Sequence, residues 1–293
     1  MNHMVTGAYV GGFAAPLFDK RGLMIHKRRL RQSRLQVLVL EAGQDQTEDP
    51  RVQTPALWPG LVVTDSDWEF MTAPQVALNG KQIPLLQGRL LGGSSAINGM
   101  AFIANSKDKL KELGLEYVDE SVNGKNGPIQ ASFPDAVDDP IANAWVESLR
   151  GLGYPMLTDP FSGHACGGYT NATTIDPVKK TRSFSANAYY LPAKEHDNLH
   201  VVTEAVIQKV LLEAPPNGDV TATGVRYMQD NSSFTVIARR EVILCAGTFN
   251  SPKTLELPGI VSRTILERFE ERHRRRTPYV LNGPRLLVVL PTR

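Results

Sequence analysis

The chain has 293 residues, 42% of them hydrophobic, which is enough to bury one substantial core or two linked lobes. Its net charge of +2 gives no general attraction to nucleic acid, and no apolar run in the sequence approaches the length of a membrane span. The two cysteines, Cys166 and Cys245, are isolated and indicate neither a disulfide nor a metal site. Residues 1–18 lack the pattern of a signal peptide, so the cytoplasm is the default location.

Residues 1–34 form a segment that ends in a basic stretch. Residues 20–34 contain seven lysines and arginines. One interpretation is a nuclear or nucleic-acid-binding patch. Because the charge of the rest of the chain is ordinary, we favour the other interpretation, an atypical and poorly ordered leader.

The next segment has the pattern of a buried strand. Residues 35–40 (LQVLVL) are mostly apolar, as in a strand covered on both faces of a parallel sheet. The strand ends at Glu41, followed by Ala42 and Gly43. An acid at this position is usually a solvated turn residue, but in a dinucleotide-binding fold it accepts hydrogen bonds from a ribose.

Residues 88–100 (GRLLGGSSAINGM) predict a tight glycine turn that leads into a helix. Gly92 and Gly93 lack a Cβ, so the backbone there can approach a ligand closely. The free N–H groups of the following turn and the positive end of the helix dipole would suit phosphate oxygens. Ser94 and Ser95 can add side-chain donors or cap the helix instead. The alternative is an ordinary glycine-rich turn before a helix.

The second half of the chain alternates helical and strand patterns. Within residues 135–152, Ala142, Trp145, Val146 and Leu149 recur at helical spacing, which indicates a buried stripe. Five short strands are then predicted, over residues 199–202, 205–212, 224–228, 234–238 and 241–244. After the last strand we expect Ser251 to cap a helix, Pro252 to occupy its first position, and residues 253–257 to form it.

Two of these segments resemble the signatures of the glucose–methanol–choline (GMC) family of FAD-dependent oxidoreductases. Residues 88–100 resemble the first signature. Residues 247–260 (GTFNSPKTLELPGI) resemble the second, except that Pro258 stands where the family usually has serine. Residues 182–192 (RSFSANAYYLP) resemble the family stretch that leads back to the FAD domain. The resemblance covers roughly residues 35–266.

The resemblance implies an α/β fold, an FAD-binding Rossmann-like domain of the GMC type that is incomplete and carries part of a substrate-binding lobe. The FAD-binding domain is expected from residues 35–107 and 193–266. Residues 108–192 would form the partial substrate lobe, with a family segment deleted after residue 107. Residues 1–34 and 267–293 are the atypical basic leader and tail.

The implied cofactor is FAD. By resemblance Glu41 is the ribose ligand, a backbone group of Ile207 contacts adenine, and residues 98–101 run beside the flavin and pyrophosphate. The full set of cofactor-binding residues implied is Glu41, Ala42, Arg89, Gly92, Gly93, Ser94, Asn98, Gly99, Met100, Ala101 and Ile207.

The family oxidises alcohols by passing hydride to flavin while a histidine pair removes the hydroxyl proton. Here the only histidines are His3, His26, His164, His196, His200 and His273. None lies in the family's His-Pro motif, so no catalytic residue is assigned, and their default interpretation is surface or structural. A G-x-G-x-x-G turn about 20 residues before Glu41 is also missing, because Gly7, Gly11 and Gly12 have the wrong spacing.

Three hypotheses about function follow. The first is an FAD-dependent enzyme that oxidises a small organic alcohol, in secondary metabolism, with no nucleic-acid or membrane partner. The second is a catalytically inactive remnant or incomplete gene product of the family. The third is a non-enzymatic interaction protein that uses the basic ends. From the missing motifs we expect the chain to retain little FAD on purification, to expose apolar sheet edges, and to oxidise alcohols slowly or not at all.

Overall fold

The computed structural model describes residues 36–102, 127–132, 140–155, 172–213, 220–258 and 286–288. The expected leader, the deletion after residue 107 and nearly all of the expected tail lie outside these residues.

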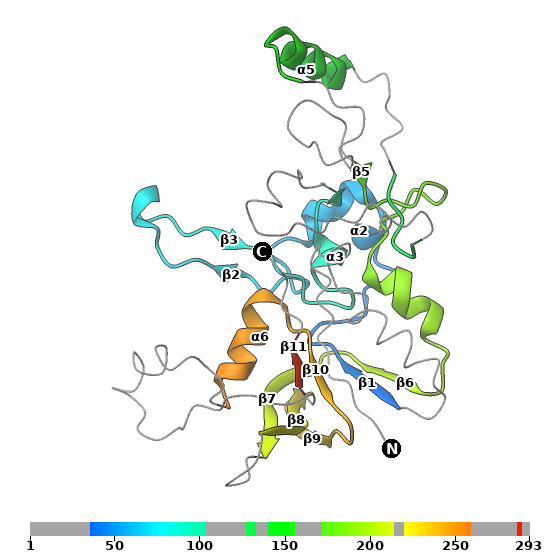
Figure 1. Cartoon of the computed structure of the whole chain (residues 1–293), viewed down its shortest axis with the longest axis vertical. Helices are drawn as coiled ribbons and strands as arrows, with labels where there is room; N and C mark the ends of the chain where they lie inside the picture. Colours follow the sequence, from blue (N-terminus) through cyan, green and yellow to red (C-terminus); the bar gives the residue numbers. More distant parts are fainter. Residues whose placement is uncertain are drawn as a thin grey trace.

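Two parallel strand pairs are present. β1 (Val37–Leu40) lies beside β6 (Leu199–Val202), and Val37 pairs with Leu199 (Figure 1). β10 (Val242–Leu244) pairs in the same sense with β11 (Leu286–Val288). The predicted strand over residues 35–40 is thus confirmed as β1, and its side chains at Val37, Val39 and Leu40 are buried.

An antiparallel meander follows in the chain. It consists of β7 (Val206–Glu213), β8 (Thr221–Gln229) and β9 (Ser232–Ile237), in that order across the sheet. Val210 of β7 and Val225 of β8 pack with Leu40 of β1 and Val242 of β10 in one hydrophobic core. This core joins the parallel strands to the meander, which confirms the strands predicted from residue 199 onward.

A second core lies against the short helices that follow β1, up to and including the helix of the first signature. These are α2 (Pro50–Gln53), the 3₁₀ helix η1 (Pro55–Leu61) and α3 (Ser94–Ile97). Val52, Leu61, Leu90, Ile97 and Phe184 are all buried together there. Phe184 precedes a π-helical turn, η5 (Ala186–Tyr190), and a 3₁₀ turn, η6 (Leu191–Ala193).

Two small antiparallel pairs complete the described part. β2 (Phe70–Met71) and β3 (Pro84–Leu85) form a hairpin that extends away from the core, with the 3₁₀ turn η2 (Val76–Leu78) in its loop (Figure 1). β4 (Ala101–Phe102) pairs with β5 (Ala172–Thr173). Within the described ranges, no helix combines the length and the apolar character that a bilayer crossing needs.

The helix predicted within residues 135–152 forms as α5 (Pro140–Gly151), but its apolar stripe is not a core. The side chain of Trp145 is 69% exposed, and Val146 and Leu149 are only half-buried. Figure 1 shows α5 at one end of the molecule, away from the sheets. The spacing predicted the helix correctly, but the predicted burial of its apolar stripe is wrong. Periodicity shows which side chains share a face and not what covers that face.

The second signature begins its helix earlier than expected. α6 spans Gly247–Glu256 and follows β10 almost directly, so Ser251 is not its N-cap and Pro252 lies inside it. Gly247 adopts a φ of +85°, a left-handed conformation that glycine adopts without strain and that starts the helix at once. Pro252 removes the hydrogen bond to the carbonyl of Thr248, which belongs to an exposed residue and can be hydrated.

Candidate functional site

Glu41 lies at the carboxyl end of β1, as expected. It is 3% exposed, and its Oε1 accepts a hydrogen bond from the backbone N–H of Gly43 at 2.9 Å. Its backbone is held as well, because its carbonyl accepts from the N–H of Ala205 at 2.8 Å. Ala42 is also buried. The structure therefore presents this carboxylate from a tight, rigid turn of residues 41–43.

The 41–43 turn packs directly against the first signature. A Cβ on Gly43 would lie 1.9 Å from the carbonyl oxygen of Arg89 and 2.5 Å from the nitrogen of Leu90. The N–H of Leu91 donates to the carbonyl of Gln44 at 2.9 Å. Two segments far apart in sequence are thereby held in backbone contact, and only glycine at position 43 permits it.

The glycine turn of the first signature forms as predicted, although its glycines face protein. Gly92 and Gly93 have φ values of +103° and +53°. A Cβ on Gly92 would lie 2.9 Å from the ring of Phe184, and one on Gly88 would lie 2.4 Å from Gly93. These contacts explain the glycines as a packing requirement of this turn.

The helix after this turn, α3, has only four residues, so its dipole is much smaller than we expected from the sequence. The groups that remain for anion binding are those of the turn itself. The N–H of Gly93 donates to Leu90 and that of Ala96 to Gly93, which leaves the N–H groups of Ser94 and Ser95 at the first helical positions. These two donors, together with side-chain hydroxyls, are the groups that could meet an anion.

The two serine hydroxyls have different roles, and neither caps the helix. Ser95 Oγ donates to the carbonyl of Gly92 at 2.6 Å and lies 2.8 Å from Ser185 Oγ, so it is used inside the protein. Ser94 Oγ accepts from the N–H of Gly88 at 3.1 Å, and accepting leaves its own hydrogen able to donate. Of the two alternatives left by the sequence, ligand donor is the one that suits Ser94.

Residues 98–101 are held by a group that sequence reasoning passed over, the guanidinium of Arg182. Asn98 Oδ1 accepts from the N–H of Met100 at 2.9 Å and from Arg182 Nη1 at 2.9 Å. Gly99 lies beside the Trp58 ring, and Ala101 begins β4. Arginine is normally a surface residue, so the only signal in the sequence was its place at the head of residues 182–192.

Ile207 lies on β7, the edge strand of the meander, where it pairs with Tyr227. It follows Ala205, the residue that donates to the carbonyl of Glu41. The structure thus brings Ile207 close to the 41–43 turn. The outer edge of β7 has no partner strand within its described sheet.

Arg89 connects the two signatures through aromatic rings. Its guanidinium carbon lies 5.3 Å from the centre of the Trp68 ring, a cation–π contact. Trp68 stacks on Phe70 with ring centroids 6.0 Å apart, and Phe70 meets Phe249 edge-on at 5.3 Å. Arg89 Nε is buried and has no hydrogen-bond partner in the part of the chain that the structure describes. A ligand acceptor in this region would satisfy it.

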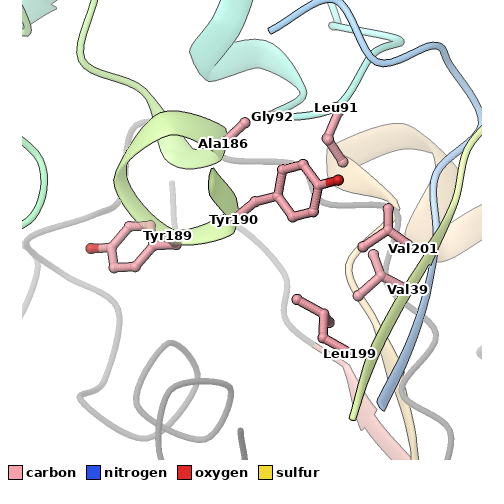
Figure 2. Close-up of a pocket in the computed structure, with 8 residues that line it drawn as sticks. All are labelled: Val39, Leu91, Gly92, Ala186, Tyr189, Tyr190, Leu199 and Val201. Atoms are coloured by element: carbon pink, nitrogen blue, oxygen red, sulfur yellow. The ribbon is translucent and has the colours of Figure 1, made fainter. Parts of the chain in front are cut away.

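A small apolar cavity lies between the β1–β6 pair and η5 (Figure 2). Its lining residues are Val39, Leu91, Gly92, Ala186, Tyr189, Tyr190, Leu199 and Val201. Figure 2 shows the Tyr190 ring directed toward Leu91 and Tyr189 turned the other way. Burial, with the negative charges of Asp45 and Glu195, raises the pKa of Tyr190 above its ordinary value. The cavity offers apolar contact and no charge for a phosphate.

The two described histidines confirm the expectation of a surface role. His196 is exposed, and His200 is exposed with its Nε2 2.9 Å from Gln36 Oε1. The other four lie outside the described residues. Within the described ranges no cluster of three potential metal ligands occurs.

The fold and this site define a flavoprotein-type α/β domain, and comparison with known proteins gives the family. The family model GMC oxidoreductase matches residues 9–271, and the chain belongs to this family. The match starts within the 1–34 segment that we expected to be atypical. Dehydrogenase citC of Monascus ruber is 32% identical over 282 residues, which are 84% of this chain and 45% of the relative.

Other relatives and solved structures agree. Oxygen-dependent choline dehydrogenase of Pectobacterium carotovorum is 32% identical over 84% of this chain and 47% of its own length. The chain spans about half the length of these curated relatives. Pyridoxine 4-oxidase from Mesorbium loti superposes with a TM-score of 0.74 at 24% identity, covering 97% of this chain and 56% of that one. An FAD-dependent oxidoreductase from Chaetomium thermophilum also gives 0.74 at 24% identity, over 92% and 49%. These structures show that the fold is that of the GMC FAD-binding domain, partly covered.

Proposed function

We propose that the described residues bind FAD and that the protein is an FAD-dependent oxidoreductase acting on a small organic alcohol. The observation that carries the proposal is the backbone contact between the 41–43 turn and Arg89. It places a buried carboxylate suited to ribose hydroxyls next to the turn whose donors suit phosphate.

The residues present fit such a cofactor. Among the described residues, Arg89 Nε and Ser251 Oγ find no hydrogen-bond partner although both are buried, one in each signature. Buried polar atoms that lack partners are costly, and a bound polar molecule would satisfy them. The left-handed turn at Gly92 and Gly93 turns the chain so that Ser94 and Ser95 begin a helix, with their N–H groups unused by it.

Each group has a definite task in this proposal. Glu41 would accept from ribose hydroxyls, with Ala42 beside it and Ile207 offering a backbone group to adenine. Ser94 and the turn at Gly92 and Gly93 would hold phosphate oxygens. Bound FAD would supply the electron-accepting chemistry of the oxidation.

Residues 98–101 would run beside the flavin. The same proposal divides the chain into FAD-binding segments, residues 35–107 and 193–266, and a partial substrate lobe, residues 108–192. The substrate is proposed only as a class. Relatives include oxygen-dependent choline dehydrogenases, and one solved neighbour is described as a fungal aryl-alcohol oxidase. A hydroxyl on a small organic molecule is common to both names.

Titration with FAD tests the proposal. We expect saturable quenching of the fluorescence of added FAD, at an affinity low enough that little cofactor survives purification, with ADP as a competitor because it carries the adenosine and phosphate groups. Ser94→Ala should weaken binding by about tenfold or more, the effect of one hydrogen bond to a charged group. Ser148→Ala, on the exposed face of α5, is the control. Absence of saturable binding, or unchanged affinity in Ser94→Ala, would contradict the proposed site.

A further inference from the structure

Arg182 is a buried cation surrounded by backbone carbonyls. Its side chain is 0% exposed, and within the described residues no carboxylate pairs with it. Nε donates to the carbonyl of Val52 at 2.9 Å, and Nη1 donates to that of Asn98 at 2.7 Å, while Nη2 is buried without a hydrogen-bond partner among the described residues. Burial lowers the pKa of the guanidinium to about 10, so it is charged at neutral pH. A buried charge without an opposite charge needs its hydrogen bonds to offset desolvation.

The acceptors of Arg182 are placed where a cation is favourable. Val52 lies in α2, and Asn98 is the C-cap of α3, so both carbonyls belong to helix C-terminal ends, where unpaired carbonyls concentrate. The backbone of Arg182 is itself fixed, because its N–H donates to Gln53 at 3.0 Å and its carbonyl accepts from Asn187 Nδ2 at 2.7 Å. The fork therefore joins the two helices from a rigid position.

The same fork controls the conformation of the chain after α3. Asn98 Oδ1 is shared between Arg182 Nη1 and the N–H of Met100, each at 2.9 Å. Met100 has a φ of +61°, which residues with a Cβ seldom adopt, and its carbonyl accepts from the N–H of Thr174 at 2.9 Å. A strained residue persists only when its surroundings hold it. Arg182 supplies that constraint through Asn98.

We propose that Arg182 is a positioning residue that fixes the turn of residues 98–100, and so the backbone presented to the flavin. The consequence for the cofactor rests on the proposed function, whereas the effect on the turn does not. Lysine should not replace it, because one ammonium group cannot reproduce the planar fork that reaches Val52 and Asn98 together.

Hydrogen–deuterium exchange tests the effect on the turn without any cofactor. Arg182→Met and Arg182→Lys should each speed exchange in peptides covering residues 94–101 by about tenfold or more, as expected on losing a hydrogen bond to a charged group. Peptides from β8 and β9 should be unchanged. Asn98→Ala, which removes the side-chain amide and with it the shared Oδ1 acceptor, should give the same local effect and is the variant to use if Arg182→Met does not fold. Arg226→Met, at an exposed arginine of β8, is the control.

The outcomes separate the alternatives. Faster exchange confined to residues 94–101 supports positioning, while equal loss of protection in β8 and β9 means a merely structural arginine and overturns it. An exchange rate in residues 94–101 of Arg182→Lys equal to that of the wild type also overturns the proposal. FAD affinity is then measured for the same variants. Wild-type binding that weakens in Arg182→Lys and not in Arg226→Met extends the effect to the cofactor. If the wild-type chain binds no FAD, the proposed function fails, and the exchange result still decides the role of Arg182.

Discussion

Replacement of Gly43 by alanine tests how the two halves of the candidate site are held together. The added Cβ would lie 1.9 Å from the Arg89 carbonyl oxygen and 2.2 Å from its carbon. Both are backbone atoms, so no flexible side chain can move aside. The 41–43 turn must separate from Arg89 instead.

The size of the effect follows from three contributions. Overpacking costs roughly 1–3 kcal/mol, and the upper end applies to a backbone clash. Separation would also break the hydrogen bond from Leu91 to Gln44, worth about 1 kcal/mol. Alanine recovers about 0.4–1 kcal/mol through the unfolded state. We therefore expect Gly43→Ala to lower the free energy of unfolding by about 3 kcal/mol, a melting-temperature decrease of roughly 6–12 °C.

Two other glycines provide matched controls. A Cβ on Gly60 would meet only the Arg51 side chain, at 3.6 Å, so Gly60→Ala should be neutral within about 1 kcal/mol. A Cβ on Gly224 would lie 2.2 Å from the Val236 carbonyl oxygen, between β8 and β9 and outside the candidate site. Gly224→Ala should therefore destabilise the fold as Gly43→Ala does.

Urea unfolding and FAD titration decide between the alternatives. Both crowded variants should have lower midpoints, and only Gly43→Ala should also lose FAD affinity under conditions where the variant is folded. A midpoint for Gly43→Ala equal to that of Gly60→Ala would refute the packing argument. Equal FAD affinity in Gly43→Ala and Gly224→Ala would refute the link between this contact and the cofactor.

Two further predictions concern the aromatic contacts and the thiol. Trp68→Leu should lower the free energy of unfolding by about 1 kcal/mol or more, because it loses the contacts with Arg89 and Phe70. Trp145→Leu, at a residue that is 69% exposed, should change the free energy of unfolding by less than about 0.5 kcal/mol. Equal urea midpoints for the two variants would contradict this prediction. Burial raises the pKa of Cys245 from 9.0 to about 12, so the folded chain holds the thiol proton more tightly than the unfolded chain. The contribution to stability is complete below about pH 9 and declines toward pH 12. Urea midpoints of the wild type should therefore fall more steeply across this window than those of Cys245→Ala, and parallel curves would show the thiol to be accessible.

The local sequence pattern was enough to predict the elements that are encoded by their own residues. The apolar run at residues 35–40 gave β1, and the alternating segments after residue 199 gave the meander, since each strand is encoded by its own residues. The glycine turn at Gly92 and Gly93 was equally readable, because positive φ values favour glycine wherever they occur.

The sequence could not predict which residues far apart in the chain contact each other. The need for glycine at Gly43 arises from Arg89, and the value of Arg182 arises from the carbonyls of Val52 and Asn98. Periodicity placed Trp145 in a buried stripe, and that prediction fails here, while no local pattern indicated that Arg182 is buried. These interactions depend on tertiary contacts that no local window contains.

The pairing of β1 with β6 has a consequence for how the protein is made. Val37 cannot find Leu199 until the intervening chain has left the ribosome, which takes on the order of ten seconds or more at usual rates of synthesis. During that time the apolar edge of β1 is unpaired, and closing so long a loop is slow even afterwards. The meander, whose strands adjoin in sequence, can form as soon as it emerges. The nascent 41–43 turn, which the proposed cofactor site needs, therefore lacks its contact with Ala205 until that residue has been synthesised.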